Sequence, residues 1–375
     1  MKQRITAFRA ASPWLIAIYL LLSSVAAVSI VSFLVRRAGS TFHTVPMLIC
    51  LVLAVLLHLV LHEAGHYLFG RMTGFEFFML RLGSRSLVRE SGEFVMRELT
   101  PESLLLSVVM AKKDPEDKMY TPFFLGGALL NLSVSLLAFI LLFFKVFSPS
   151  SVFGALLYSL LFVGIYAGLM TLLPAYHGLL PNDGMRLIQF LRDPLARESY
   201  VRNMTMIRYL SSDEEEEEPP LETVDLLADE DDDPMSLFRA SYLLRTYEQY
   251  LWAGNTDRAS HILASLYFHI TDFPEEWQNR IMQEAIFFLC LSGSNEENDL
   301  ADRLVTPGRR KFFEEIAASE AKRSLYFWSL HHQEMQRDTR RYSKKAFETL
   351  QLVPFAKARN AWKNQLYLAG SEAVS

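Results

Sequence analysis

The sequence contains little cysteine and little charge. Only two cysteines occur in 375 residues, Cys50 in an apolar run and Cys290 in a predicted helix, so a disulfide-stabilised scaffold is excluded. Charged residues make up 21% of the chain against 51% hydrophobic residues, and the mean hydropathy is +0.15. This composition argues against a disordered chain and against an ordinary soluble enzyme. The formal charge is −5, and we expect no nucleic-acid partner.

Long runs without charge are abundant instead. Four of them predict transmembrane helices, at about residues 14–35, 47–69, 121–144 and 152–174. Each is long enough, because a helix needs about 20 apolar residues to cross a hydrocarbon core of about 30 Å. The first run is followed by Arg36 and Arg37, and its length exceeds that of a typical signal peptide. We therefore expect an uncleaved first helix.

Basic residues predict how these helices are oriented. The loop 70–120 carries eight lysines and arginines, whereas the loops on the other side keep only Arg36, Arg37 and Lys145. Loops rich in lysine and arginine stay on the cytoplasmic side of a membrane. The sequence therefore predicts a multi-pass protein of the cell membrane, with the chain after Pro174 in the cytoplasm.

The second apolar run contains the sequence His62-Glu63-Ala64-Gly65-His66. Positions i and i+4 of a helix project from one face, so both imidazoles can bind a single zinc ion, and Glu63 can act as a general base. In an apolar helix these polar side chains are costly unless they are paired or coordinated, which favours a functional site. The alternative is that the two histidines only hydrogen-bond neighbouring helices. His58, one turn earlier on the same face, is predicted to be a supporting or packing residue.

Two further motifs follow in the chain. The segments are Gly126-Gly127-Ala128-Leu129-Leu130-Asn131 and Leu172-Leu173-Pro174, the latter followed by Asn182-Asp183-Gly184. Together with the histidine motif, they resemble the site-2 protease family of intramembrane zinc metalloproteases over about residues 45–195. The resemblance implies that His62, His66 and Asp183 bind Zn²⁺ and that Glu63 is the catalytic base. It also implies that Asn131 helps to place the substrate or the catalytic water.

The chain departs from the pattern of this family in three respects, one of them Ala128, where the family usually has proline. Thr171 stands where the family usually has asparagine, and the nine residues from Pro174 to Asp183 exceed the usual spacing. An ordinary Asp-Gly turn is therefore an alternative for Asp183. His177, in the same loop, is an alternative metal ligand.

The loop between the second and third apolar runs alternates apolar and polar residues. This pattern predicts short strands at 75–80, 87–89, 94–98 and 107–110. In the resembled family, a small membrane-associated sheet precedes the third core helix and can present substrate as an added strand. A plain amphipathic loop at the membrane surface is the alternative.

The remaining chain predicts a linker and a helical domain. Residues 213–233 contain 13 acidic and no basic residues, which predicts a disordered spacer, with a calcium site as a weaker alternative. After it, helical periodicity predicts three hairpins, at 242–268, 284–304 and 326–350. These pairs resemble tetratricopeptide repeats, but the interval from Gly254 to Gly293 is 39 residues rather than about 34. A solenoid-like domain that binds a protein partner and a generic helical bundle both stay open.

The sequence thus predicts an all-α polytopic membrane protein with a small membrane-associated sheet and a cytoplasmic helical domain. Its expected domains are a membrane-embedded metalloprotease domain (1–212), the acidic linker (213–233) and the helical domain (234–375). The expected function is hydrolysis of peptide bonds in a membrane-spanning or membrane-associated protein or peptide, as in regulated intramembrane proteolysis, with the helical domain recruiting or regulating. The alternative is a non-catalytic membrane scaffold that retains the fold.

Overall fold

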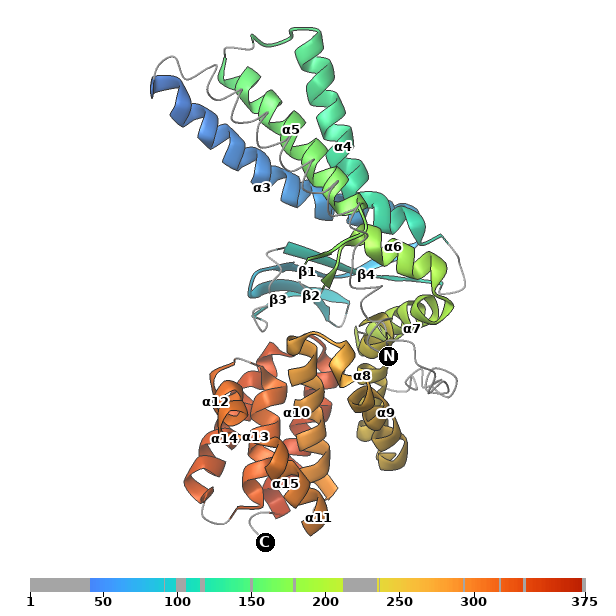
Figure 1. Cartoon of the computed structure of the whole chain (residues 1–375), viewed down its shortest axis with the longest axis vertical. Coiled ribbons are helices and arrows are strands. Elements are labelled where there is room, and N and C mark those ends of the chain that lie inside the picture. The colour runs from blue at the N-terminus through green and yellow to red at the C-terminus, as the bar shows by residue number, and fades with distance from the viewer. Residues whose placement is uncertain are drawn as a thin grey trace. The chain divides into compact units, whose positions relative to one another are not determined.

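The structure is a computed structural model (Figure 1). It describes residues 41–90, 92–98, 106–114, 119–148, 151–177, 180–211, 235, 237–292, 294–316, 318–332 and 335–372. The predicted first transmembrane helix at 14–35 and the acidic linker at 213–233 lie outside these residues. The chain forms two compact units. The first contains the residues up to Phe77 together with Lys112–Pro194, and the second contains Phe78–Ala111 together with Leu195–Ser375. The long C-terminal part of the second unit begins at Leu195, and the predicted domain boundaries at 212 and 233 stay predictions.

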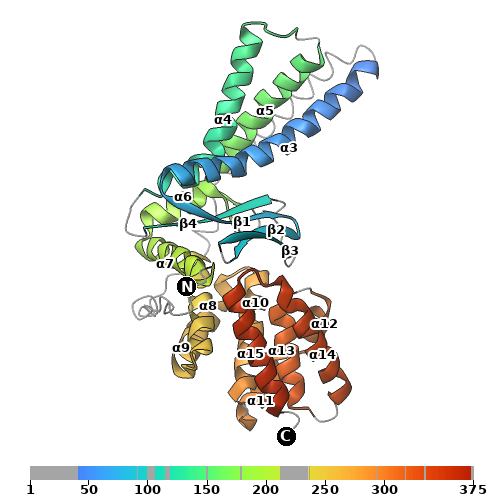
Figure 2. The ribbon, with the colours of Figure 1, turned by 180° about the vertical axis from the view of Figure 1, so that it is seen from behind.

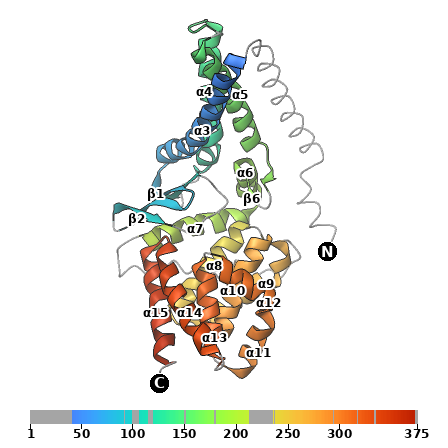
Figure 3. The same cartoon turned by 90° about the vertical axis from the view of Figure 1, so that its left-hand side faces the viewer.

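Three long apolar helices make up most of the first unit. They are α3 (Thr41–Met72), α4 (Thr121–Phe143) and α5 (Val152–Leu172), and they pack along one another in Figures 1 and 3. Each is long and apolar enough to cross a membrane, which confirms three of the four predicted spans. Large apolar side chains such as Leu56, Leu136 and Phe153 stand on their outer surface, as expected of helices surrounded by lipid.

The backbones of α3 and α4 touch where they cross. A Cβ atom added to Gly65 would overlap the carbonyl group of Gly126, and one added to Gly126 would lie 2.5 Å from the carbonyl oxygen of Gly65. Glycine at both positions is therefore required for this close approach, a common device where helices pack within a membrane. The crossing lies between His62 and His66 on one helix and the start of α4 on the other, so it sets the distance between these elements.

A four-stranded sheet follows α3 and confirms the predicted strands. Its strands are β1 (Phe75–Leu82), β2 (Arg85–Glu90), β3 (Glu93–Glu98) and β4 (Leu106–Lys112), in the order β3-β2-β1-β4. The strands β1, β2 and β3 are antiparallel. Gly83 has a φ of 59° in the two-residue turn between β1 and β2, a conformation that this tight turn requires. Met79 and Val88 face each other across these strands and are buried against Val109.

The second unit is mainly helical. The three predicted hairpins are confirmed as α8 (Leu237–Trp252) with α9 (Thr256–Phe268), α10 (Glu275–Ser292) with α11 (Asn295–Leu304), and α13 (Ser319–Leu330) with α14 (Gln336–Thr349). Two further helices, α12 (Pro307–Glu315) and α15 (Ala356–Glu372), were not predicted. The C-terminal helix α15, drawn in dark red in Figure 2, packs against α14. A tetratricopeptide-like solenoid stays a prediction.

One carboxylate ties the sheet to the helices of this second unit. Glu90, at the end of β2, accepts two hydrogen bonds from Arg97 on β3, at 3.1 and 2.6 Å. The Nη2 atom of Arg359 on α15 lies 2.9 Å from Oε1 of the same carboxylate. Arg359 also donates to the carbonyl of Val353, 2.8 Å away. The two arginines lower the pKa of Glu90 although its burial acts in the opposite direction.

A charged pair is buried in the helical core. Arg323 on α13 donates to both carboxylate oxygens of Glu284 on α10, at 2.6 and 2.5 Å. The Arg323 guanidinium lies between the rings of Phe287 and Trp362, with 4.0 and 4.2 Å to their centroids. These contacts join α10, α13 and α15 around one cation. Removing only one partner of such a buried pair destabilises a protein strongly.

Glu248 on α8 is buried near this pair. Burial, followed by the charge of Glu284, raises the pKa of Glu248 from 4.5 to about 7; Glu320 adds to the shift, and Arg280 and Arg323 oppose it. Between pH 4.5 and 7, Glu248 therefore stays protonated in the folded chain and is ionised in the unfolded chain. The stability that this proton contributes is fully present below pH 4.5 and is lost as the pH rises through 7.

We expect Glu248→Gln to remove this pH dependence. Near pH 8 the variant should be more stable than the wild type by up to about 3 kcal/mol, because each pKa unit corresponds to about 1.4 kcal/mol. Near pH 4.5 the two free energies of unfolding should be similar. Denaturant unfolding of the full chain in detergent measures both, by tryptophan fluorescence, since four of the five tryptophans follow residue 234. The exposed Glu315→Gln serves as the control, and equal stabilities of wild type and Glu248→Gln at pH 8 would contradict the prediction.

Candidate metal centre

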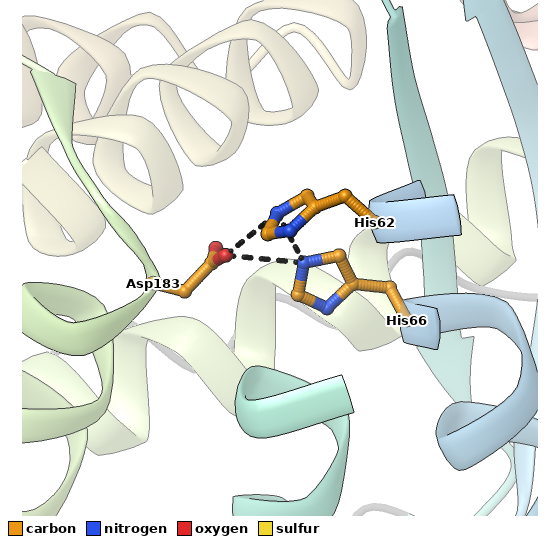
Figure 4. A group of neighbouring side chains, drawn as sticks. All are labelled: His62, His66 and Asp183. Carbon is orange, nitrogen blue, oxygen red and sulfur yellow. Dashed lines mark hydrogen bonds and ion pairs between the residues drawn. The ribbon is translucent and has the colours of Figure 1, made fainter. Parts of the chain in front are cut away.

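Three polar side chains meet beside the crossing of α3 and α4. His62 and His66 project from the same face of α3 toward Asp183, the first residue of α6 (Asp183–Arg192), as Figure 4 shows. The Oδ2 atom of Asp183 lies 2.9 Å from Nε2 of His62 and 3.2 Å from Nε2 of His66. The two Nε2 atoms are 3.2 Å apart. The structure therefore brings together the three residues that the sequence predicted as ligands.

A small hairpin returns the chain from the end of α5 to this place. The strands β5 (Tyr176–His177) and β6 (Leu180–Pro181) pair antiparallel, so the nine residues from Pro174 to Asp183 make no long excursion. The backbone N–H of Asn182 donates to the carbonyl of Ala175, 3.0 Å away. This hairpin accounts for the unusual spacing. The backbone of His177 lies in β5, and its side chain is outside the described part of the structure.

A backbone carbonyl orients the ring of His66. Its Nδ1 lies 2.7 Å from the carbonyl oxygen of Phe123, in the first turn of α4. A carbonyl oxygen only accepts hydrogen bonds, so Nδ1 carries the proton and, in the neutral ring, Nε2 keeps its lone pair. The ring of Phe123 is itself stacked on Phe75 of β1, with 4.6 Å between the centroids. A second ring nitrogen held in this way is typical of histidines that bind metals.

Gly127 makes room for the other imidazole. A Cβ atom at this position would lie 2.5 Å from Nδ1 of His62. The Nδ1 atom is buried and has no hydrogen-bond partner among the described residues. The ring of His62 is thus positioned by close packing, with its Nε2 directed at Asp183.

The arrangement of donor atoms fits a zinc ion. In a tetrahedral site with bonds of about 2.0–2.1 Å, two ligand atoms are about 3.3 Å apart. The three separations here, 2.9, 3.2 and 3.2 Å, are close to this value. The lone pair on Nε2 of His66 points at the carboxylate of Asp183, and these two electron-rich atoms would repel each other at 3.2 Å. A proton or a cation between them removes this repulsion. Three protein ligands also leave a fourth position open, as in catalytic zinc sites.

The electrostatic setting agrees with this fit. Burial alone would raise the pKa of Asp183, but the facing imidazoles of His62 and His66 more than offset it and lower the pKa below the ordinary value. The carboxylate is therefore ionised at neutral pH, the form that binds metals. The side chains of His62 and Asp183 keep 17% and 13% of their surface exposed, so the described residues do not cover them completely.

Glu63 occupies the position next to His62 on α3 and is half-buried. It is the polar residue of the motif His62–His66 that is not one of the three grouped residues. Its place one residue after a ligand suits a group that acts on a water molecule near the metal rather than on the metal. Its role as a base stays a prediction.

His58, one turn before His62 on α3, and Asn131 on α4 form a separate buried cluster. Nδ1 of His58 lies 3.0 Å from the amide oxygen of Asn131, and Nε2 donates to the carbonyl of Leu160 on α5, 2.9 Å away. Ser135 donates to the carbonyl of Asn131. These bonds join α3, α4 and α5, which agrees with a supporting role for His58. The predicted role of Asn131 in placing substrate or water stays a prediction, and its side chain contacts His58 rather than the three grouped residues.

Two positions near the candidate metal centre were marked by the sequence, Thr171 and the Gly126-Gly127 pair, whereas the Phe123 carbonyl was not. The hydroxyl of Thr171, where the resembled family has asparagine, donates to the carbonyls of Ala167 and Gly168 in its own helix. The Phe123 carbonyl is a backbone group that no motif marks. The glycine pair Gly126-Gly127 was the only signal that a second helix backbone comes close to the histidines.

Comparison with protein-family models, with curated proteins and with solved structures finds no match for this chain. The interpretation of the site therefore rests on its geometry and on the motifs in the sequence.

We expect Gly127→Ala to weaken zinc binding about tenfold or more, because the added methyl group must displace the His62 ring. Zinc affinity of the detergent-solubilised chain, with circular dichroism to verify the helices, measures this effect. Gly308→Ala is the matched control, since a Cβ atom there meets nothing within 4 Å. Unchanged zinc affinity in a folded Gly127→Ala chain would show that the packing of His62 does not matter for the metal.

Proposed function

We propose that this chain is an intramembrane zinc metalloprotease, that is, a site-2-type metallopeptidase. The observation that carries the proposal is the convergence of His62 and His66 on the apolar helix α3 with Asp183 at the start of α6. Ionisable groups among membrane-spanning helices are rare and most often mark a functional site. Hydrolysis fits this donor set best, because two histidines and one carboxylate with an open position are typical of zinc peptidases.

His62, His66 and Asp183 would hold the zinc ion. Zinc held there would supply Lewis-acid chemistry, which would polarise the scissile carbonyl and lower the pKa of water. Glu63 accepts the proton of the attacking water and transfers it to the leaving amine. The Phe123 carbonyl keeps His66 in the tautomer that leaves Nε2 free, and Gly127 keeps His62 in place.

The substrate class follows from the surroundings of the site. His62 and His66 stand on a helix that is apolar enough to lie in a bilayer, so the substrate is a membrane-spanning or membrane-associated protein or peptide. Peptide bonds inside a helix are shielded from attack, so the segment to be cleaved must be extended. The strands β3 and β4 are the edges of the sheet, and an edge strand can hold an extended segment by main-chain hydrogen bonds.

The location and partners belong to the same proposal. The bases in loop 70–120 support a cell-membrane protein whose sheet and helical hairpins face the cytoplasm. The stacked helix pairs of the second unit support the binding of a protein partner there, which would recruit substrate or regulate cleavage.

A non-catalytic membrane scaffold is the second candidate. The tie between the sheet and α15 through Glu90 and Arg359 favours it, because a scaffold needs a firmly joined partner-binding domain. It does not explain why three ligating groups meet in apolar surroundings.

We expect Glu63→Gln to lower peptide cleavage about 100-fold or more while zinc content stays unchanged, because the variant loses the general base and no ligand. His62→Ala should lose both zinc and cleavage. The assay uses the purified chain in liposomes with a labelled synthetic peptide that contains one apolar span.

Glu348→Gln, an exposed glutamate on α14, is the control and should cleave like the wild type. Equal cleavage by the wild type and Glu63→Gln would refute the mechanism. A wild-type chain without zinc, combined with a functional His62→Ala chain, would favour the scaffold.

A further inference from the structure

Asn182, the residue before the candidate ligand Asp183, has its side chain fully engaged. It is 9% exposed. Its amide nitrogen donates to the carbonyls of Met170 and Leu173, at 2.9 and 2.6 Å. Its amide oxygen accepts from the backbone N–H groups of Ala175 and Met185, at 3.1 and 3.0 Å. One side chain therefore makes four hydrogen bonds to the main chain.

These bonds connect three segments. Met170 and Leu173 belong to the last turn of α5 and the residue after it, where carbonyl groups lack partners within the helix. Met185 is in the first turn of α6, so Asn182 is also the N-cap of that helix. Ala175 leads into the hairpin. Asn182 thus closes the C-terminal end of α5, the hairpin and the N-terminal end of α6 at once.

The chemistry of asparagine is needed for this combination. Its amide offers two N–H donors and an oxygen acceptor on a short stem. Aspartate and serine keep an acceptor for the helix cap but cannot supply both donors, and alanine supplies neither. The usual N-cap role is therefore only half of what this residue does.

Gly184, two residues after Asn182, lies at the same junction of α5 and α6. A Cβ atom at Gly184 would overlap the carbonyl oxygen of Leu172, so α6 begins in direct contact with the end of α5. Asp183 lies between Asn182, whose hydrogen bonds stabilise this junction, and Gly184, whose lack of a side chain permits the close approach. The place of its carboxylate, 2.9 Å from His62 and 3.2 Å from His66, is fixed by the junction rather than by α6 alone.

We infer that Asn182 is a positioning residue of the metal centre, which holds Asp183 at ligand distance from the two histidines. The inference rests on the proposed metal-binding function. Metal sites tolerate only small changes of ligand position, about 0.2 Å. Loss of Asn182 therefore frees Asp183 from the site before it disturbs the three long helices, which are held together elsewhere by the Gly65–Gly126 contact and the His58 cluster.

The test is metal binding by the full chain in detergent, with Co²⁺ as a spectroscopic probe and Zn²⁺ in competition. We expect Asn182→Ala to weaken metal binding about 10- to 100-fold, as is typical when a residue supporting a ligand is lost. Asn182→Ser, which keeps only the cap acceptor, should fall between Asn182→Ala and the wild type. At saturating Co²⁺, the visible absorption of Asn182→Ala should shift toward that of Asp183→Ala, because the carboxylate has left the ion.

The matched control is Asn255→Ala. Asn255 is also an asparagine N-cap, accepting from the N–H of Arg258 at the start of α9, so its loss removes the same kind of bond far along the chain. It should bind metal with the affinity and absorption spectrum of the wild type. A general effect of losing a helix cap would appear in both variants, whereas a positioning role appears only at Asn182.

The outcomes separate the two claims. A wild-type chain that binds neither Co²⁺ nor Zn²⁺ refutes the proposed function and the inference with it. A wild-type chain that binds metal, together with a folded Asn182→Ala chain of equal affinity and spectrum, refutes the inference alone. If Asn182→Ala and Asn182→Ser both unfold, Asn182 is a determinant of the fold, which also overturns a role specific to the metal centre.

Discussion

The contact between the backbones of α3 and α4 at Gly65 and Gly126 is the constraint on which the rest of the metal centre depends. Because the helices touch there, the Phe123 carbonyl comes within 2.7 Å of His66 and the Gly127 backbone lies against the ring of His62. Both imidazoles then have defined orientations without any charged partner on α4. A side chain at either glycine would separate the helices and release both rings.

Two buried polar side chains at the apolar helices, His58 and Asn182, join one element to another. His58 connects α3 to Asn131 of α4 and to the Leu160 carbonyl of α5. Asn182 connects the end of α5 to the beginning of α6. Because water is scarce around such helices, each unsatisfied group would be expensive, and each satisfied one specifies a single arrangement. A few polar contacts thus determine how the helices pack, because the large apolar surface alone would allow many arrangements.

The sequence predicted those parts that depend on local composition. The spans of α3, α4 and α5 follow from uncharged runs, and the four strands follow from the alternation after Phe75. The helix α12 was missed because its sequence is short and highly charged, and α15 because its apolar residues are sparse. At the site, helical spacing placed His62 beside His66. The hairpin before Asp183 and the partners of Asn182 could not be predicted, since they depend on main-chain groups distant in sequence.

The strand β1 begins in one compact unit and ends in the other. The chain crosses between the units at Phe77, again at Ala111 and a third time at Pro194. A single proteolytic cut after Pro194 would therefore leave the strands of 78–111 on the N-terminal fragment, covalently separated from the helices of the second unit and from Arg359, the partner of Glu90. The two units cannot be exchanged between proteins as separate cassettes, so a change of the helical part during evolution must preserve the strands inserted between α3 and α4.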